Sequence, residues 1–214
     1  MADRKIQSKK RYVLAFLIGT FIFINVFFLT YSISYFEYQR ISSEQQQLSY
    51  DIFKDELYYS LFDKNNCSLS SLSKISEDLR FQGSIIDELE KKLGKNNQGV
   101  LFRKKFYSLI ELEHFEFIGK MNDKCKFNIS TILFFYSNED KDIKNSESVG
   151  RLLDSVYTRN NDLVIYSFDI NLDDELIIGL KKEYLIIEPF TIIINKKIKV
   201  VDPKNIEEIE KYLS

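Results

Sequence analysis

The sequence contains few of the residues on which most enzyme sites are built. Its 214 residues include one histidine, His114, and two cysteines, Cys67 and Cys125, which lie far apart. A zinc site needs several Cys and His ligands at close spacing, so this set does not predict one. A Ser/His/Asp triad would have to use His114, and there is no glycine-rich phosphate-binding loop. We therefore expect no metal and no other cofactor.

Glycine and proline are also scarce, with 7 and 2 copies. Because these residues most often mark turns, their scarcity predicts long regular elements and few loops. Hydrophobic residues make up 44% of the chain and aromatic residues 14%. That content is enough for packed cores and argues against disorder.

A cluster of basic residues is missing after the first twelve residues. The formal net charge is −2, yet residues 1–12 contain five basic residues and one acid, which sum to +4. Residues 13–36 carry no charge, so residues 37–214 sum to −6. A mildly acidic region without a basic cluster argues against nucleic acid as a partner.

One long apolar run, residues 12–36, contrasts with these absences. It reads YVLAFLIGTFIFINVFFLTYSISYF, 25 residues without a charge. At about 1.5 Å per residue it reaches roughly 37 Å, enough to cross a hydrocarbon core of about 30 Å with some tilt. The run predicts a transmembrane anchor that contacts the lipid bilayer. A cleaved signal peptide is the alternative, but the run exceeds a typical h-region and no small-x-small site follows it.

The charges around this run predict its orientation. Five basic residues precede it within residues 1–11, whereas Glu37 and Arg40 are the first charges after it. By the positive-inside bias, residues 1–11 form a cytoplasmic tail and the C-terminal bulk is extracytoplasmic. We expect a single-pass protein of the cell membrane.

Residues 37–125 are predicted to form a stalk of three antiparallel helices. The first, from Glu37 to about Phe62, continues directly from the membrane helix, and the third runs from about Gln98 to Asn122. The second, from about Ser70 to Leu93, carries an apolar seam with steps of three and four. The seam consists of Leu72, Ile75, Leu79, Gln82, Ile86, Leu89 and Leu93. The same seam would also suit a coiled coil between copies, so a homo-oligomer through the stalk stays open.

An apolar stripe on the third helix includes the single histidine. Its members are Val100, Tyr107, Ile110, His114, Phe117 and Met121, with Phe102, Phe106 and Leu109 widening it. A wide face predicts packing against two neighbours. On such a face we interpret His114 as a hydrogen-bonded packing residue.

The two cysteines lie at the ends of predicted helices. In an up-down-up stalk, Cys67 and Cys125 fall at the same end, and an extracytoplasmic compartment permits disulfides. We predict a structural Cys67–Cys125 bond; a redox pair is the alternative, although the separation does not resemble a C-x-x-C motif. Asn66 and Asn128 begin N-x-S patterns, which are weak signals for glycosylation.

Residues 126–214 change to short elements of mixed type. Residues 131–136 (TILFFY) and 163–168 form β-rich apolar runs, and helices are predicted at about 146–159 and 173–184. Residues 191–194 and 198–201 predict a hairpin, and Asp202-Pro203 predicts the start of a final helix. The order β-α-β-α-β-β-α indicates an α/β domain, with α+β character overall. The first two strands are expected to be parallel and the last two antiparallel.

This order resembles the minimal thioredoxin fold. A proline just before the third strand, Pro189, and the segments FFYSNE and VIYSFDINLD are similar to membrane-anchored, extracytoplasmic thioredoxin-like proteins of archaeal type. The resemblance implies a substrate-binding rim formed by the Asn138–Asn145 loop and by the Pro189–Phe190 turn, next to Thr191. In the family a cis-proline lies at that turn.

The redox motif of the family is absent. Where redox-active members carry C-x-x-C, this chain reads Asp142, Ile143, Lys144 and Asn145. No thiolate can form there, so this domain alone cannot exchange disulfides. Acids at Asp169, Asp173, Asp174 and Glu175 are interpreted as solvated helix-start residues in preference to a Ca²⁺ site.

These patterns lead to three hypotheses about function. The first is a redox-inactive, membrane-tethered module that binds an envelope or exported protein, with interaction or chaperone-like work and no catalytic residue. The second is a thiol-disulfide oxidoreductase or isomerase that uses Cys67 and Cys125. The third is a scaffold that works through its stalk.

Overall fold

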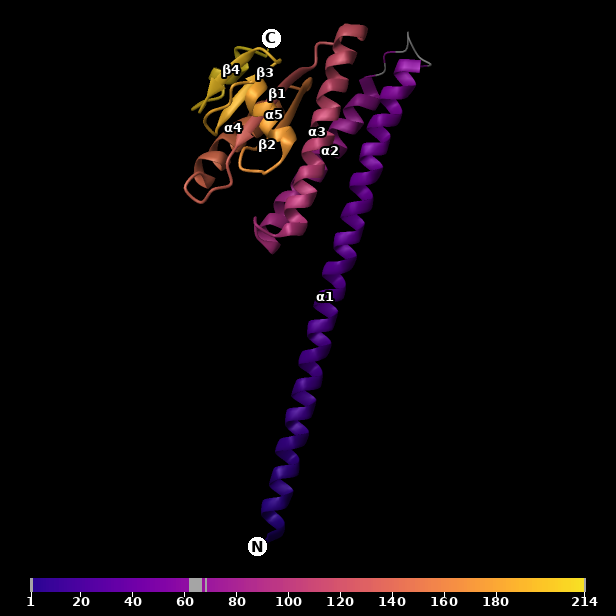
Figure 1. Cartoon of the computed structure of the whole chain (residues 1–214), viewed down its shortest axis with the longest axis vertical. Coiled ribbons are helices and arrows are strands. Elements are labelled where there is room, and N and C mark those ends of the chain that lie inside the picture. Colours follow the sequence, from indigo (N-terminus) through magenta and orange to yellow (C-terminus); the bar gives the residue numbers. More distant parts are fainter. Residues whose placement is uncertain (1, 62–66, 68, 214) are drawn as a thin grey trace. The chain divides into compact units, whose positions relative to one another are not determined.

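The computed structural model describes residues 2–61, 67 and 69–213 (Figure 1). The chain divides into two compact units, Met1–Gln46 and Gln47–Ser214, and this division falls inside helix α1 (Ala2–Leu61). The sequon at Asn66 lies outside the described residues.

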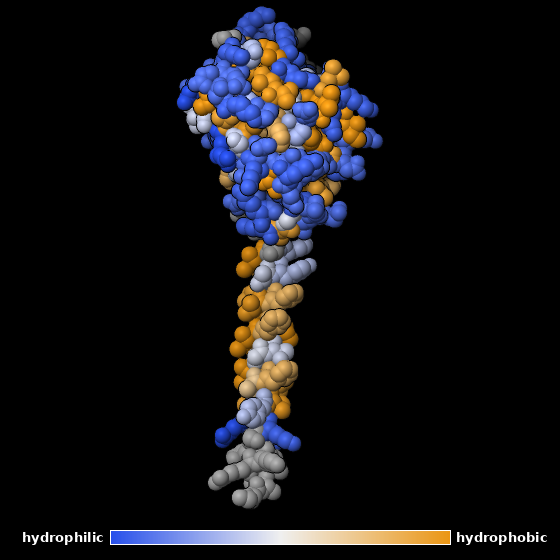
Figure 2. All heavy atoms as spheres, turned by 90° about the vertical axis from the view of Figure 1, so that its left-hand side faces the viewer, coloured by the Kyte–Doolittle hydropathy of each residue, from blue (hydrophilic) through white to orange (hydrophobic). Residues whose placement is uncertain are grey.

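Helix α1 contains the predicted membrane span. The segment Lys9–Ile33 is long and apolar enough to cross a membrane, and none of it is buried inside the protein. Its side chains form the apolar, orange-coloured sheath visible in Figure 2. Within the span, the Asn25 amide donates to Phe21 O and the Thr30 hydroxyl donates to Val26 O, so these polar groups are satisfied within the helix.

The same helix continues through the predicted first stalk segment without a break. In that segment Tyr50 and Phe53 are 61% and 53% exposed. These two rings therefore do not enter the core of the second unit.

Helices α2 (Leu69–Leu93) and α3 (Gln98–Cys125) form an antiparallel hairpin. Gly94, at φ 89°, ends α2, and the Asn97 side chain begins α3 by accepting from the N–H groups of Gly99 and Val100. Most predicted seam residues of α2 are buried, as expected: Ile75, Leu79, Gln82, Ile86 and Leu89.

The predicted apolar faces are wrong at three places. Leu93, Phe102 and Leu109 are 49%, 67% and 51% exposed. They lie off the side of the hairpin that meets the sheet. Helix α3 buries a displaced face instead, which includes Arg103, Lys104 and Glu111.

The remaining elements form a four-stranded mixed sheet with helices. The strands are β1 (Ser130–Tyr136), β2 (Leu163–Asp169), β3 (Thr191–Ile194) and β4 (Ile198–Val201). Their order is β2-β1-β3-β4; β1 and β2 are parallel, and the other two pairs are antiparallel. Helices α4 (Ile143–Arg159), α5 (Glu175–Glu183) and α6 (Glu207–Glu210) complete it. The predicted element order is confirmed.

Two helix boundaries differ from the sequence-based expectation. Helix α4 begins at Ile143, so residues 143–145 form its first turn and are not loop. Helix α6 is a single turn, although Asp202-Pro203 predicts a start there. Asp202 has φ 49° and its N–H donates to Phe190 O, so it closes the hairpin and does not cap a helix.

The sheet is buried on both faces. Leu133 and Phe135 of β1 pack with α2, α3 and α5 on one face, and Ile132 and Phe134 pack with α4 and α6 on the other. The predicted stalk helices α2 and α3 thus share a core with the sheet, within one compact unit.

Candidate functional site

A cleft of about 760 Å³ lies between the hairpin α2–α3 and helix α4. Residues from β1 and β2 form its floor. One wall includes Leu79, Arg80 and Ile86 of α2, and the other includes Gly150, Leu153 and Tyr157 of α4. Its volume is in the range of ligand-binding sites in proteins.

A buried group of charges forms one end of this cleft. The Lys104 ammonium contacts Glu90 Oε1 at 2.7 Å and Asp169 Oδ2 at 2.6 Å, and all three side chains are at most 9% exposed. The Asn138 amide donates to Glu90 Oε1 at 3.0 Å and to Asp169 Oδ2 at 3.3 Å. The Lys104 Nζ also lies 5.1 Å from the centre of the Tyr136 ring. This set joins α2, α3, β1 and β2: one ammonium lies between two carboxylates, and the neutral Asn138 amide donates to both of them, which suits a structural role.

A second buried carboxyl group lies deeper in the cleft. Glu111 is 1% exposed, and its Oε1 accepts from the Ser167 N–H at 2.8 Å. Its Oε2 has no hydrogen-bond partner in the described part of the chain. The nearby Tyr107 hydroxyl donates to the Leu79 carbonyl at 3.1 Å. Burial raises the pKa of Glu111 well above its usual value.

His114 is a core residue, as predicted. It is fully buried, with Nδ1 2.9 Å from the Tyr166 hydroxyl and Nε2 3.5 Å from Ser76 Oγ. Burial lowers the pKa of His114 to about 4, so it is neutral at physiological pH.

The four residues that the resemblance aligns with a C-x-x-C motif, Asp142 to Asn145, occupy the start of α4. The Asp142 carbonyl accepts from the N–H groups of Asn145 and Ser146, and the Asp142 side chain makes no capping bond. Lys144 and Asn145 are exposed, and Ile143 lines the cleft. Of the four residues, Ile143 alone lines the cleft.

The Pro189 turn does not reach the cleft at all. The peptide bond before Pro189 is trans, since the described residues contain no cis bond. Phe190 is 9% exposed and packs in the core with α4, and Thr191 is 1% exposed. Phe190 therefore cannot present its ring to a partner, which corrects the expectation of a rim that includes it.

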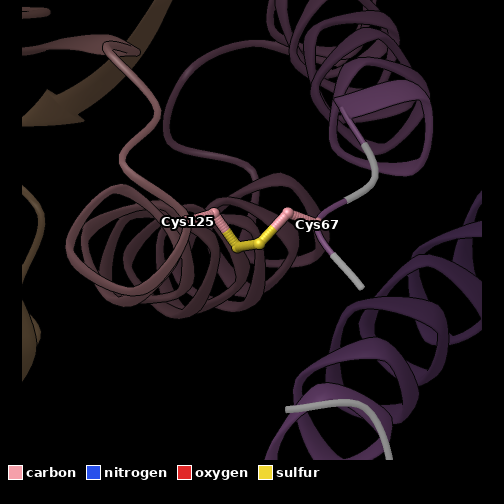
Figure 3. The surroundings of a disulfide bond; sticks show 2 residues. All are labelled: Cys67 and Cys125. Atoms are coloured by element: carbon pink, nitrogen blue, oxygen red, sulfur yellow. A yellow bond between two sulfur atoms is a disulfide. The ribbon is translucent and has the colours of Figure 1, made fainter. Parts of the chain in front are cut away.

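Cys67 and Cys125 form the predicted disulfide (Figure 3). The bond joins the segment before α2 to the last residue of α3. Neither sulfur lines the cleft.

The acids considered as Ca²⁺ ligands have other contacts. Asp169 accepts from Lys104 and, through Oδ1, from the Asn171 N–H at 3.0 Å. Asp174 caps α5 by accepting from the Leu176 N–H at 2.9 Å. The helix-start interpretation holds for Asp174 but not for Asp169, which is a buried ion-pair residue.

Sequence reasoning missed Glu90, Lys104 and Glu111. None of the three belongs to the apolar positions predicted for the two helices, so local periodicity carried no signal for their burial. Their partners are also distant in the chain: Asp169 lies 65 residues from Lys104.

Comparisons with protein-family models, with curated proteins and with solved structures give no match.

Proposed function

We propose that this protein is a membrane-anchored, redox-inactive module of thioredoxin-like architecture that binds another envelope or exported protein. One observation carries the proposal. The start of α4 holds Asp142 to Asn145 with no thiol, and the two cysteines of the chain are bonded to each other. Thiol exchange at the family's usual position therefore has no nucleophile.

Three features support the thioredoxin-like architecture. Helix α4 connects the parallel strands β1 and β2. Strands β3 and β4 form an antiparallel hairpin at the other edge, and β1 lies between β2 and β3. This is the strand order that the resemblance implies for residues 126–214.

The charge pattern supports the orientation. Five basic residues precede the span and an acidic region follows it, so the second unit belongs outside the cytoplasm. Labelling intact cells with a membrane-impermeant maleimide tests this. Lys182→Cys should react and Lys5→Cys should not. The reverse pattern would place the second unit in the cytoplasm.

Crosslinking from the membrane tests the function. The full-length protein and a Cys67→Ser/Cys125→Ser variant are crosslinked in native membranes and their adducts identified by mass spectrometry. A binding module recovers the same extracytoplasmic partner with both. Mixed disulfides trapped only when Cys67 or Cys125 is present, together with insulin reduction by the purified protein, would favour the oxidoreductase. Unchanged adducts after deletion of residues 127–214 would favour a scaffold formed by the helices.

A further inference from the structure

The cleft follows the outer edge of strand β2. This strand ends the sheet, with β1 as its single neighbour. The side chains of Val164 and Ile165 point to opposite faces of the sheet, yet both residues line the cleft. Both can do so only where the cleft passes the edge of the strand.

Hydrogen bonds at the two ends of the ladder show which backbone groups face that edge. The Ser130 N–H donates to the Asp162 carbonyl at 2.8 Å, and the Ile170 N–H donates to the Tyr136 carbonyl at 2.9 Å. Even-numbered residues of the second strand therefore turn their backbone groups to β1. In a parallel ladder the intervening odd-numbered residues turn theirs outward.

Two outward-facing residues lie within the cleft. The Ser167 N–H is already bonded to Glu111. The N–H and C=O of Ile165 have no hydrogen-bond partner among the described residues. Ile165 is half-buried and lines the cleft, so its carbonyl oxygen and its N–H are available at the floor of the cleft to pair with another strand.

Glu111 supplies an independent observation. Its Oε2 is buried, lines the same cleft and accepts no hydrogen bond within the described part of the chain. A buried carboxyl oxygen without a hydrogen-bond partner is unfavourable. The burial that raises the pKa of Glu111 favours its neutral form, and a backbone amide group of a ligand can partner that carboxyl group.

The dimensions and the lining suit a short extended chain. On α2 the cleft runs from Ser76 to Lys91, about 22 Å along the helix axis. At roughly 3.3 Å per residue this length holds about seven residues of an extended peptide. Leu79 and Leu153 offer apolar contacts from opposite walls. A small compact ligand would not use the full length.

We propose that the cleft binds an extended peptide segment as a further strand on β2, paired with Ile165 and with a backbone amide group on Glu111. Side chains of the segment alternate between the α2 wall, where Asp87 lies, and the α4 wall, where Leu153 lies, so polar and apolar residues alternate along it. This inference rests on the proposed function and assigns its binding surface, which lies along the edge of the sheet and not at the Pro189 turn.

Arg80 closes the outer side of this surface. Its guanidinium contacts Asp154 Oδ1 at 3.4 Å and lies 4.2 Å from the centre of the Tyr157 ring, so it bridges the two walls. Arg80 and Asp154 are 53% and 70% exposed, and an exposed pair of this kind is weak. An incoming segment can displace it, and Arg80→Ala should tighten binding two- to fivefold.

Two glycines provide a matched test on the full-length protein in micelles. A side chain added at Gly150 enters the open cleft, and one added at Gly179 of α5 enters open space elsewhere, since neither Cβ meets an atom within 4 Å. The probes are fluorescein-labelled heptapeptides in which Val, Leu or Phe alternates with Lys. We expect Gly150→Trp to weaken binding at least tenfold and Gly179→Trp to leave it unchanged. Equal effects of the two variants, or no binding by any peptide, would overturn the proposal.

Backbone methylation separates strand pairing from simple side-chain binding. N-methylating every odd residue of the best peptide blocks one edge, and N-methylating every even residue blocks the other. Strand addition predicts that one isomer binds at least tenfold more weakly than the other. Equal binding of the two isomers would reject pairing with β2.

The outcome also separates this inference from the proposed function. If the membrane crosslinks to a partner persist in Gly150→Trp while the peptides fail, the protein is a binding module with another binding surface. If no partner is crosslinked at all, the proposed function itself is wrong.

Discussion

The Lys104 ammonium and the Asp169 carboxylate lie 2.6 Å apart in the interior, 65 residues apart in the chain. This pair joins helix α3 to the end of strand β2, and Glu90 extends it to α2. It therefore connects the helical hairpin to the sheet at one end of the cleft.

Removing the lysine should be strongly destabilising. Lys104→Met leaves two buried carboxylates without their cation, and we expect a loss of about 3–5 kcal/mol in the free energy of unfolding. Denaturant titration of the full-length protein in micelles measures it. Asp154→Asn, which breaks the exposed pair with Arg80, should cost at most about 1 kcal/mol. Equal losses in the two variants would show that the buried group does not connect the hairpin to the sheet.

The disulfide should stabilise the second unit. Cys67→Ser/Cys125→Ser opens a loop whose ends are 58 residues apart in the chain. The chain-entropy account predicts a loss of about 4 kcal/mol, which reduction of the wild-type protein should reproduce. Mass spectrometry under non-reducing conditions should detect no free thiol; two free thiols would contradict the bond.

His114 should make stability fall as the pH falls. Its pKa is lowered to about 4 in the folded protein, against about 6.5 in the unfolded chain. Between these values the unfolded state binds a proton that the folded state does not, so stability decreases from pH 6.5 toward pH 4. The full effect is about 3 kcal/mol. In His114→Gln this pH dependence should be flatter, whatever the variant's stability at pH 7; an unchanged slope would refute the assignment.

Glu111 should have the opposite effect to His114: it should make the free energy of unfolding increase as the pH falls. Because its pKa is raised in the folded state, the folded protein binds the extra proton as the pH falls through that value, and stability increases. Glu111→Gln keeps an acceptor for the Ser167 N–H and removes the charge. Relative to wild type it should be more stable at pH 8, with the advantage shrinking toward pH 4.5. A control at an exposed site, Glu183→Gln, should show no such trend.

The sequence by itself determined the local and covalent features. An uncharged run at residues 12–36 requires a long exposed helix, and the alternation of apolar runs and helical periods gave the correct order of elements after residue 126. These features depend on near neighbours in the chain, so composition and period suffice to predict them. The pairing of Cys67 with Cys125 followed because there are no other cysteines.

Only the tertiary structure decided where the hairpin and the sheet meet. The periodicity of α3 does not distinguish the buried Lys104 and Glu111 from the exposed Phe102, because burial there depends on the approach of β2 and α4. The packing of α4 against the sheet also buries Phe190. It leaves the backbone N–H and C=O of Ile165, at the outer edge of β2, open to the cleft. Contacts between residues far apart in sequence are set by the packing of whole elements, which no local pattern records.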